Sequence, residues 1–282
     1  MRKVLLWVGV LGVLGPSVAA TARTLPPPPP LYSWNNCYVG GNIGYSWGKA
    51  KTDTTTPDLT VGGLTVPGQT SSNSNNLDGV IGGGQVGCNW QPASTWLLGI
   101  EADFQWSGEK GSFSADDPFK FNLDPPAPPG TTAIGVTNID PETGISWFGT
   151  VRGRVGYIWN NWLFYATGGL AYGKVTYSGA GITESGNISI PRLRLPPLVI
   201  PFTQTASFGS ASKVNTGWTI GGGIEAPLFN IPNWTWKVEY LYMDLGKLDL
   251  TAVTSGGGIA TSSTKFTDNI VRVGLNYHFW TH

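Results

Sequence analysis

Charged residues are scarce in this sequence, at 12% of 282 residues, with 17 basic and 17 acidic side chains. Typical helical proteins contain more Lys and Glu, so the composition disfavours that class. Beyond Leu14 no apolar run is long enough to form a spanning helix, which disfavours a helical membrane protein. A basic excess is also missing, so no nucleic-acid partner is expected.

Glycine and tryptophan are abundant instead, with 40 and 13 residues, and the mean hydropathy is near zero. This composition is typical of many short strands separated by polar loops. The start of the chain differs: Arg2 and Lys3 precede an apolar run at 4–14 and small residues at 17–22. We expect residues 1–22 to be a secretory signal peptide, because about eleven apolar residues are too few for a retained anchor, which needs about twenty.

Cleavage within 17–22 removes Arg2 and Lys3, which leaves 15 basic against 17 acidic residues. Five consecutive prolines follow at 26–30. A proline run favours an extended polyproline conformation and cannot pair inside a sheet. We therefore expect residues 23–35 to be a stiff periplasmic spacer.

The last strand, 269–279, shows the clearest pattern. Apolar Val271, Val273, Leu275, Tyr277 and Phe279 alternate with a polar set that includes an arginine. A period of two indicates a strand with one apolar and one polar face. Aromatic residues close to the chain end are typical of the closing strand of an outer-membrane barrel.

Seven further segments alternate in the same way, at 36–48, 79–90, 98–106, 145–159, 162–177, 214–226 and 234–244. The first, third, fifth and seventh strands are followed by long polar segments, 49–78, 107–144, 178–213 and 245–266, and the others by short turns. Prolines at 125, 126, 128 and 129 indicate that 107–144 is not regular sheet. The asymmetry predicts an all-β fold, an eight-stranded antiparallel up-and-down transmembrane barrel over 36–279, with four long extracellular loops and three short periplasmic turns.

A soluble lipocalin-like barrel would share this strand count. Tryptophans at the strand ends favour the membrane barrel, because they suit two interfacial girdles. They are Trp47, Trp90, Trp106, Trp147, Trp159, Trp162 and Trp234.

Eight charged residues fall on the inward parity of the predicted strands. They are Glu101, Asp103, Arg152, Arg154, Glu225, Lys237, Glu239 and Arg272. Charges are costly against lipid, so they point into the lumen, where neighbouring strands bring opposite signs together. Because side chains fill the interior of an eight-stranded barrel, we interpret the set as a buried ion-pair network. A narrow charged pore is the alternative.

The two cysteines, Cys37 and Cys88, share the outward parity at the periplasmic end of neighbouring strands. If these strands pair with residue numbers that sum to about 125, the cysteines stand opposite each other. A disulfide formed in the oxidising periplasm is then expected. Two free thiols facing lipid are the alternative.

Histidine is almost absent, since His278 and His282 are the two in the chain and both lie at its C-terminal end. Outer-membrane hydrolases and acyltransferases need a general base near the loops, and no loop here offers a histidine. The sequence therefore predicts neither an enzyme nor a metal site. Gly82, Gly84 and Gly87 match G-x-G-x-x-G, but no helix follows them, so no cofactor is expected. The predicted loops contain no histidine that could bind haem, so haem binding would need a tyrosine ligand such as Tyr177.

The third loop contains an unusual apolar segment at 188–202 that includes Arg192 and Arg194. One hypothesis is contact with lipopolysaccharide, with the arginines on phosphate and the leucines on acyl chains. The alternative is a loop that packs over the barrel mouth.

Seven segments carry a resemblance to a known family: Cys-Tyr-Val-Gly-Gly-Asn at 37–42, Gly-Gly-Gln-Val-Gly at 83–87, Gly-Ile-Glu-Ala-Asp-Phe at 99–104, Val-Arg-Gly-Arg-Val-Gly at 151–156, Thr-Gly-Gly-Leu-Ala-Tyr at 167–172, Val-Glu-Tyr-Leu-Tyr at 238–242 and Val-Arg-Val-Gly-Leu-Asn-Tyr-His-Phe at 271–279. The sequence resembles the outer-membrane immunogenic protein group of alphaproteobacteria, often called a porin family. The resemblance implies the barrel fold. It implies little about activity, because most members are described as abundant surface antigens and envelope-integrity proteins, and a few as haem binders.

Tyr277 and Phe279 then correspond to the signal read by the barrel-assembly machinery, and residues 280–282 are a short tail after the usual terminal Phe. We expect a non-enzymatic outer-membrane protein of a Gram-negative bacterium that contributes to envelope structure and exposes loops at the surface. Its partners would be outer-membrane lipid and lipopolysaccharide, with the assembly machinery during biogenesis. A small passive pore for ions or solutes is the alternative function.

Overall fold

The structure is a computed structural model, described here for residues 32–112, 114–178, 181–228, 231 and 233–279. The predicted signal peptide, most of the predicted spacer and the tail at 280–282 lie outside these residues. The described strands are β1 Cys37–Thr55, β2 Leu59–Val61, β3 Leu64–Val66, β4 Thr70–Trp90, β5 Trp96–Ser112, β6 Ala115–Asn122, β7 Thr132–Ile139, β8 Glu142–Trp159, β9 Trp162–Ser178, β10 Gly181–Arg192, β11 Leu195–Ser207, β12 Ala211–Pro227, β13 Trp234–Val253 and β14 Ile259–His278. Among the described residues, no helix is long and apolar enough to cross a membrane.

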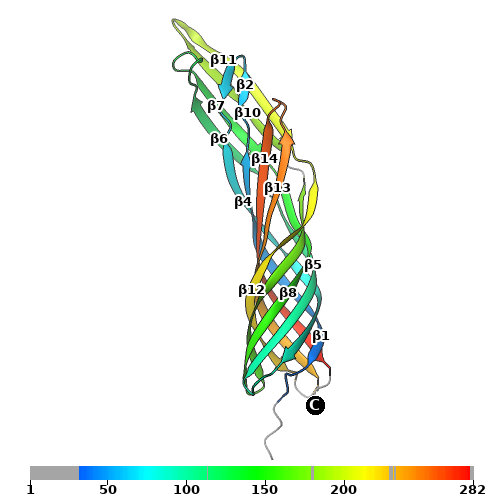
Figure 1. The fold of residues 1–282 in the computed structure, drawn as a ribbon. Helices are drawn as coiled ribbons and strands as arrows, with labels where there is room; N and C mark the ends of the chain where they lie inside the picture. The colour runs from blue at the N-terminus through cyan, green and yellow to red at the C-terminus, as the bar shows by residue number, and fades with distance from the viewer. Residues whose placement is uncertain (1–31, 113, 179–180, 229–230, 232, 280–282) are drawn as a thin grey trace, which may run out of the picture. The chain divides into compact units, whose positions relative to one another are not determined.

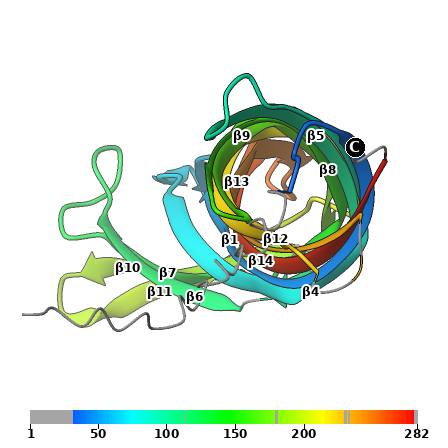
Figure 2. The ribbon, with the colours of Figure 1, turned by 90° about the horizontal axis from the view of Figure 1, so that it is seen from below.

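Eight of these strands form a closed antiparallel barrel in the order β1-β14-β13-β12-β9-β8-β5-β4. Figure 1 shows the strands from the side, and Figure 2 shows the ring that they close when viewed along the barrel. The first and last barrel strands seal it, with Val39 opposite Tyr277 and Tyr45 opposite Val271. All eight predicted strands are present, so the predicted fold class is confirmed.

The alternation of the sequence separates the two faces of the barrel wall. In β14 the side chain of Val273 is 50% exposed, whereas Arg272 and Asn276 are fully buried on the inward face. Outward aromatic residues lie at both ends of the apolar stretches. One set is on the side of the short turns, and the other is on the side of the long connections: Trp90, Trp96, Tyr157, Trp159, Trp162 and Trp234 on the first, and Tyr45, Trp47, Trp106 and Trp218 on the second.

The membrane-spanning part of each barrel strand lies between these two aromatic sets. It covers residues 39–47 of β1, 98–106 of β5 and 269–277 of β14, where Trp47 pairs with Asn269 and Val39 with Tyr277. The strands continue past the outer set on the extracellular side. This makes the described barrel wall longer than the apolar belt that the membrane covers.

The long connections are strands over much of their length, which corrects the prediction of polar loops. β1 runs on to Thr55 and β4 begins at Thr70, so most of 49–78 is paired sheet. The segment 107–144 contains β6 and β7, although its prolines predicted irregular structure. The reason is position: the prolines at 125–129 lie in the connection between β6 and β7, where no ladder hydrogen bond is needed.

The four strands β6, β7, β10 and β11 form a separate sheet in the order β11-β10-β7-β6. Pro118 lies in one edge strand and Pro201 in the other, which proline tolerates. A small apolar core joins this sheet to the β2–β3 hairpin. It contains Leu59, Leu64, Val66, Phe119, Leu123, Ala127, Ala133, Ile188 and Phe202. The predicted third loop therefore contributes buried residues to an extracellular sheet.

The residues before β1 do not behave as a free spacer where they are described. Trp34 is fully buried and packs with Leu97, Ile158 and Leu163 at the periplasmic end of the barrel. Its backbone amide donates a hydrogen bond to Gln91 Oε1 at 3.2 Å. The spacer prediction is therefore wrong for residues 32–35, because the aromatic side chains there gain more from burial than from extended exposure.

Candidate functional site

The eight predicted lumen charges lie on five barrel strands and all point inward. Register places three pairs of opposite charge directly across from each other on neighbouring strands: Glu101 with Arg152, Glu225 with Lys237, and Glu239 with Arg272. All eight residues are between 0 and 5% exposed. The charged residues of inward parity therefore form one compact cluster of four acids and four bases.

Arg152 and Arg272 form the centre of this cluster. Arg152 contacts Glu101, and its Nη atoms lie 2.9 Å from Asp103 Oδ2 and 3.0 Å from Glu239 Oε1. Arg272 contacts the same three acids, with Nη2 3.5 Å from Glu101 Oε1, 2.9 Å from Asp103 Oδ2 and 2.5 Å from Glu239 Oε2. Three carboxylates are thus shared between two guanidinium groups on strands β8 and β14.

Lys237 and Arg154 extend the cluster toward the periplasmic end. Lys237 Nζ lies 2.9 Å from Glu101 Oε2, and Arg154 Nη2 lies 2.8 Å from Glu225 Oε2. Arg154 also approaches Glu101 at 3.4 Å, which joins the two halves. Each of the four acids therefore has at least one basic partner, as a buried charge requires.

Uncharged residues that were not among the predicted lumen residues complete the network. Tyr38 Oη donates to Glu101 Oε2 at 2.5 Å, and Tyr165 Oη donates to Glu239 Oε1 at 3.0 Å. The guanidinium of Arg154 lies 4.0 Å from the centroid of the Tyr165 ring, a cation–π distance. Both tyrosines have inward parity in their strands, so the signal that marked the charges also marked them.

Below the network, His278 connects the lumen to the N-terminal segment. Its Nε2 lies 2.9 Å from Thr235 Oγ1 and its Nδ1 lies 2.5 Å from Asn36 Oδ1. The rings of Tyr32 and Trp34 meet the imidazole edge-on, with centroids 5.9 and 6.0 Å away. Residues 32–36 therefore close the periplasmic end against the last strand.

Above the network, a large apolar cluster occupies the barrel interior. Its buried members are Ala50, Leu77, Ile81, Ile145, Phe148, Ala171, Val175, Tyr177, Leu241, Met243, Leu245, Leu248, Phe266 and Ile270. Phe148, Leu241 and Ile270 are all 0% exposed. The lumen thus contains three layers in sequence: an aromatic end, an ion-pair network and an apolar cluster.

Two acids lie beyond the outer aromatic set, on the extracellular side of the spanning segments. Glu109 and Asp268 are 2% and 1% exposed, and their carboxyl groups are hydrogen-bonded to each other. Burial, together with the facing carboxyl of Glu109, raises the pKa of Asp268 to about 9. Burial also raises the pKa of Glu109.

The lumen network can stabilise the barrel, but its acids and bases are already paired with one another. The ion-paired side chains of the network are 0% exposed, so a substrate in solution cannot reach them. Within the described residues, no group of three or more His, Cys, Asp and Glu side chains could hold a metal ion.

The two cysteines form a disulfide bond in the structure. Register pairs Cys37 with Cys88, Val39 with Val86 and Gly41 with Gly84, so each pair sums to 125. The bond joins β1 to β4 across 51 residues of sequence.

The remaining predicted residues lie at two distant places in the chain. Arg192 and Arg194 flank the turn between β10 and β11, where both are exposed and Arg194 has a positive φ of 65°. Tyr277 faces outward near the periplasmic end, and its ring packs against Trp234 and Phe279 with centroids 5.5 and 5.4 Å away. The backbone amide of Phe279 donates to the Cys37 carbonyl at 2.9 Å, so this residue still pairs with β1.

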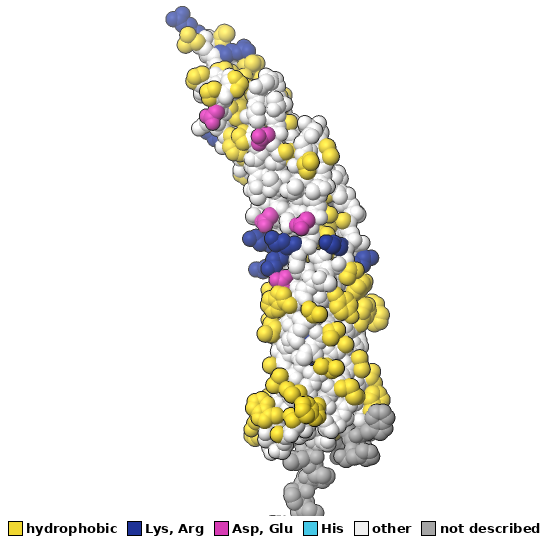
Figure 3. All heavy atoms as spheres, viewed as in Figure 1, with side chains coloured by type: hydrophobic (Ala, Val, Ile, Leu, Met, Phe, Trp, Pro, Cys, Tyr) yellow, Lys and Arg dark blue, Asp and Glu magenta, His cyan; other side chains and the backbone are white. Residues whose placement is uncertain are grey.

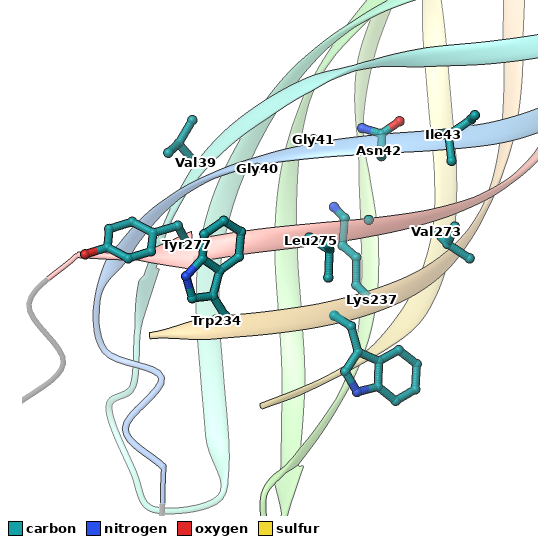
Figure 4. A pocket seen from close by; sticks show the side chains of 12 residues that line it. Val39, Gly40, Gly41, Asn42, Ile43, Trp234, Lys237, Val273, Leu275 and Tyr277 are labelled. Atoms are coloured by element: carbon teal, nitrogen blue, oxygen red, sulfur yellow. The ribbon is translucent and has the colours of Figure 1, made fainter. Parts of the chain in front are cut away.

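A recess of about 720 Å³ lies beside Tyr277 on the outer wall, where β13, β14 and β1 meet. Figure 4 shows its lining, which includes Val39, Ile43, Trp234 and Leu275. Gly41 leaves part of this space open, because a Cβ there would have no neighbour nearer than 3.8 Å. The recess belongs to the apolar belt and faces lipid, so we do not regard it as a site for aqueous chemistry.

Comparison with known proteins agrees with this architecture. Residues 9–279 match the family described as outer membrane protein beta-barrel domain. The 31 kDa outer-membrane immunogenic protein of Brucella melitensis biotype 1 is 35% identical over 259 residues, which cover 89% of this chain and 86% of that protein. The 22 kDa outer membrane protein of Rhizobium leguminosarum bv. viciae is 28% identical over 255 residues, covering 90% and 82%.

Among solved structures, Ail, the attachment invasion locus protein of Yersinia pestis, aligns with 85% of this chain and 99% of its own, at 14% identity and a TM-score of 0.33. The family match itself spans nearly the whole sequence and includes every barrel strand. This chain therefore belongs to the outer membrane protein beta-barrel domain family and is an outer-membrane protein of a Gram-negative bacterium.

Proposed function

We propose that this protein is a non-enzymatic structural component of the outer membrane whose lumen does not conduct, and that it exposes an extracellular sheet at the cell surface. The burial of the lumen network carries the proposal. Eight charged side chains at one level of a barrel would be hydrated if water passed between them, yet the ion-paired atoms lie in side chains of 0% exposure.

The layers on either side of the network support a closed lumen as well. A pore needs a continuous polar path, and the apolar cluster around Phe148, Leu241 and Phe266 offers none. Trp34 and His278 occupy the opposite end. The interior of an eight-stranded barrel is narrow enough for side chains to fill it in this way.

A structural role fits the energetic character of the network. Removing one member of a buried ion pair leaves an uncompensated charge and costs about 3–5 kcal/mol, so an interlocked set resists partial opening. Five strands contribute charges to it. Arg152 of β8 and Arg272 of β14 both contact Asp103, so their side chains connect these strands across the lumen. The network therefore ties opposite sides of the wall together.

The non-enzymatic part of the proposal rests on the same burial and on the names of the relatives. The Brucella relatives are named as outer-membrane immunogenic proteins and the Rhizobium relative as an outer membrane protein, and no enzyme activity is part of those names. The lumen acids and bases are bonded to each other and do not face a cleft. Surface presentation would fall to the sheet β6-β7-β10-β11, and assembly to the terminal aromatics Tyr277 and Phe279.

A passive pore is the second candidate, because rings of charge of both signs also line narrow channels. Planar-bilayer recordings of the purified, refolded protein separate the two functions. We expect silence from the native chain. Reproducible channels whose conductance changes in Lys237→Met, but not in the outward-facing control Leu170→Ala, would overturn the closed-lumen proposal.

A further inference from the structure

Four lysines lie side by side on the outer wall, immediately beyond the outer aromatic set. Register places Lys51 of β1 opposite Lys265 of β14, and Lys265 opposite Lys247 of β13. Lys49 lies two residues before Lys51 on the same face of β1. Like charges directly opposite each other in neighbouring strands repel, so this arrangement is unfavourable unless an anion accompanies it.

The order of outward-facing residues along each strand shows where the lysine cluster lies relative to the apolar belt. In β1, Tyr45 and Trp47 come first, Lys49 and Lys51 follow, and Asp53 comes last. The lysines therefore begin where the apolar belt ends. Figure 3 shows this order on the surface, with Lys and Arg side chains in a band directly above the hydrophobic side chains of the barrel.

The nearby carboxylates leave most of this positive charge uncompensated. Asp244 Oδ2 lies 2.9 Å from Lys265 Nζ, which forms an ion pair. Asp53 and Asp249 stand one outward position further from the membrane and accept hydrogen bonds from Ser72 and Ser263 instead, each at 2.6 Å. Asp78 lies beside Lys49 on the membrane side and accepts a hydrogen bond from Tyr45 at 2.5 Å. Lys49, Lys51 and Lys247 have no acidic partner within the described part of the chain.

A recess of about 370 Å³ opens between these lysines on β4, β1 and β14. Hydroxyl and amide groups line it together with three ammonium groups: Lys49, Lys51, Ser72, Asn73, Ser74, Lys265 and Thr267. Ammonium, hydroxyl and amide donors are the groups that hold phosphate oxygens in proteins. The recess is therefore suited to a phosphate group.

We propose that this lysine cluster binds the phosphate of a glycolipid headgroup in the outer leaflet, of the lipid A type. The position argues for a membrane lipid over a free anion. A lipid phosphate lies where the acyl chains end, and the acyl chains can follow the exposed Ile43 and Tyr45 directly below the recess. The proposal extends the structural role in the envelope by naming the lipid contact that anchors the wall at its outer edge.

The arginines of the β10–β11 turn are worse placed for this contact. Arg192 and Arg194 lie at the β10–β11 turn of the extracellular sheet, past the end of β9, whereas the lysine cluster begins two residues after Trp47. Their contact with lipopolysaccharide stays a prediction, and Arg192→Gln/Arg194→Gln compares it with the lysine cluster in the same experiment.

The test measures binding of diphosphoryl lipid A to the full-length protein in nanodiscs of zwitterionic lipid. The variant is Lys49→Gln/Lys51→Gln, because neither side chain has a protein partner whose loss would disturb folding. The control, Lys120→Gln/Lys174→Gln, removes the same charge from β6 and β9, outside the lysine cluster. Each lysine near an anionic surface contributes about fivefold in affinity, so we expect the variant to lose about 25-fold and the control less than twofold.

Two further probes identify the group that is bound. Dephosphorylated lipid A should bind the native protein as weakly as it binds the variant, and millimolar inorganic phosphate should not compete. Equal loss in variant and control, unchanged affinity in the variant, or competition by inorganic phosphate would each overturn the proposal. Failure here would leave the bilayer recordings unchanged, since those report on the lumen alone.

Discussion

Tyr38 on β1 faces Gly87 on β4, and the tyrosine ring occupies the volume that a side chain at position 87 would need. A Cβ at position 87 would lie 2.5 Å from Tyr38 Cζ and 2.8 Å from the Ile100 carbonyl oxygen. The same ring carries the hydroxyl that donates to Glu101. The glycine therefore makes room for a neutral member of the ion-pair network.

Gly87→Ala should destabilise the barrel by about 1–3 kcal/mol, the usual cost of overpacking a filled interior. The added methyl must displace the Tyr38 ring or the backbone of β5. Urea unfolding in liposomes, followed by tryptophan fluorescence, measures the change. Gly84→Ala is the matched control on the same strand, because its Cβ would face lipid with no neighbour nearer than 3.6 Å. Equal stability of both variants would contradict the assigned packing.

Glu101→Gln should cost about 3–5 kcal/mol, because Lys237 and Arg152 both lose a buried anionic partner. The double variant Glu101→Gln/Lys237→Met removes one charge of each sign and should be more stable than Glu101→Gln alone. The same unfolding measurement applies, with the exposed Glu142→Gln as a control that should change stability by less than about 0.5 kcal/mol. A double variant less stable than both single variants would show that charge balance is not what the network provides.

The barrel could be predicted from sequence because lipid and lumen impose opposite polarity on alternate residues, as Val273 and Arg272 show. The strand extensions could not. Beyond Trp47 the outward face meets water, and the inward face holds residues such as Thr52 and Thr264, which hydrogen-bond to each other at 3.0 Å. Polar residues on both faces erase the alternation, while the backbone ladder continues without it.

The charged members of the lumen site were accessible to sequence reasoning for a similar reason. A charge with inward parity has few alternatives to a partner of opposite sign, so Glu239 and Arg272 could be paired in advance. Neutral groups such as Tyr165 carry no such constraint. Trp34 was missed because the preceding prolines favour an extended chain, and nothing local indicates that the chain then turns into the barrel end.

The Cys37–Cys88 bond should stabilise the barrel mainly by restricting the unfolded chain. For a loop of 51 residues, the entropic estimate is about 4 kcal/mol, an upper value if the unfolded state retains structure. Cys37→Ser/Cys88→Ser should lower the unfolding free energy accordingly, and reduction of the native protein should have the same effect. Thiol labelling on a non-reducing gel checks the bond directly: full labelling without reductant would contradict it.

The carboxyl pair of Glu109 and Asp268 predicts a pH dependence opposite in sign to that of a salt-bridged acid. The pKa of Asp268 is raised to about 9 by burial and by Glu109, whereas an unfolded Asp titrates near about 4. Between these values the unfolded chain releases a proton that the folded chain retains. Folding stability from this group is therefore complete below about pH 4 and falls as the pH rises toward 9.

Asp268→Asn removes this loss. The unfolding free energy of the variant minus that of the native protein should therefore be about 1–3 kcal/mol larger at pH 8 than at pH 5. Urea unfolding in liposomes at both pH values measures the difference. Asp124→Asn is the control, since that carboxyl is exposed and should give the same difference at both pH values. Because burial and the neighbouring acid both act on Asp268, Glu109→Gln should produce part of the same gain. A relative stability of Asp268→Asn that stays constant or falls as the pH rises would show that the two carboxyl groups do not share a proton.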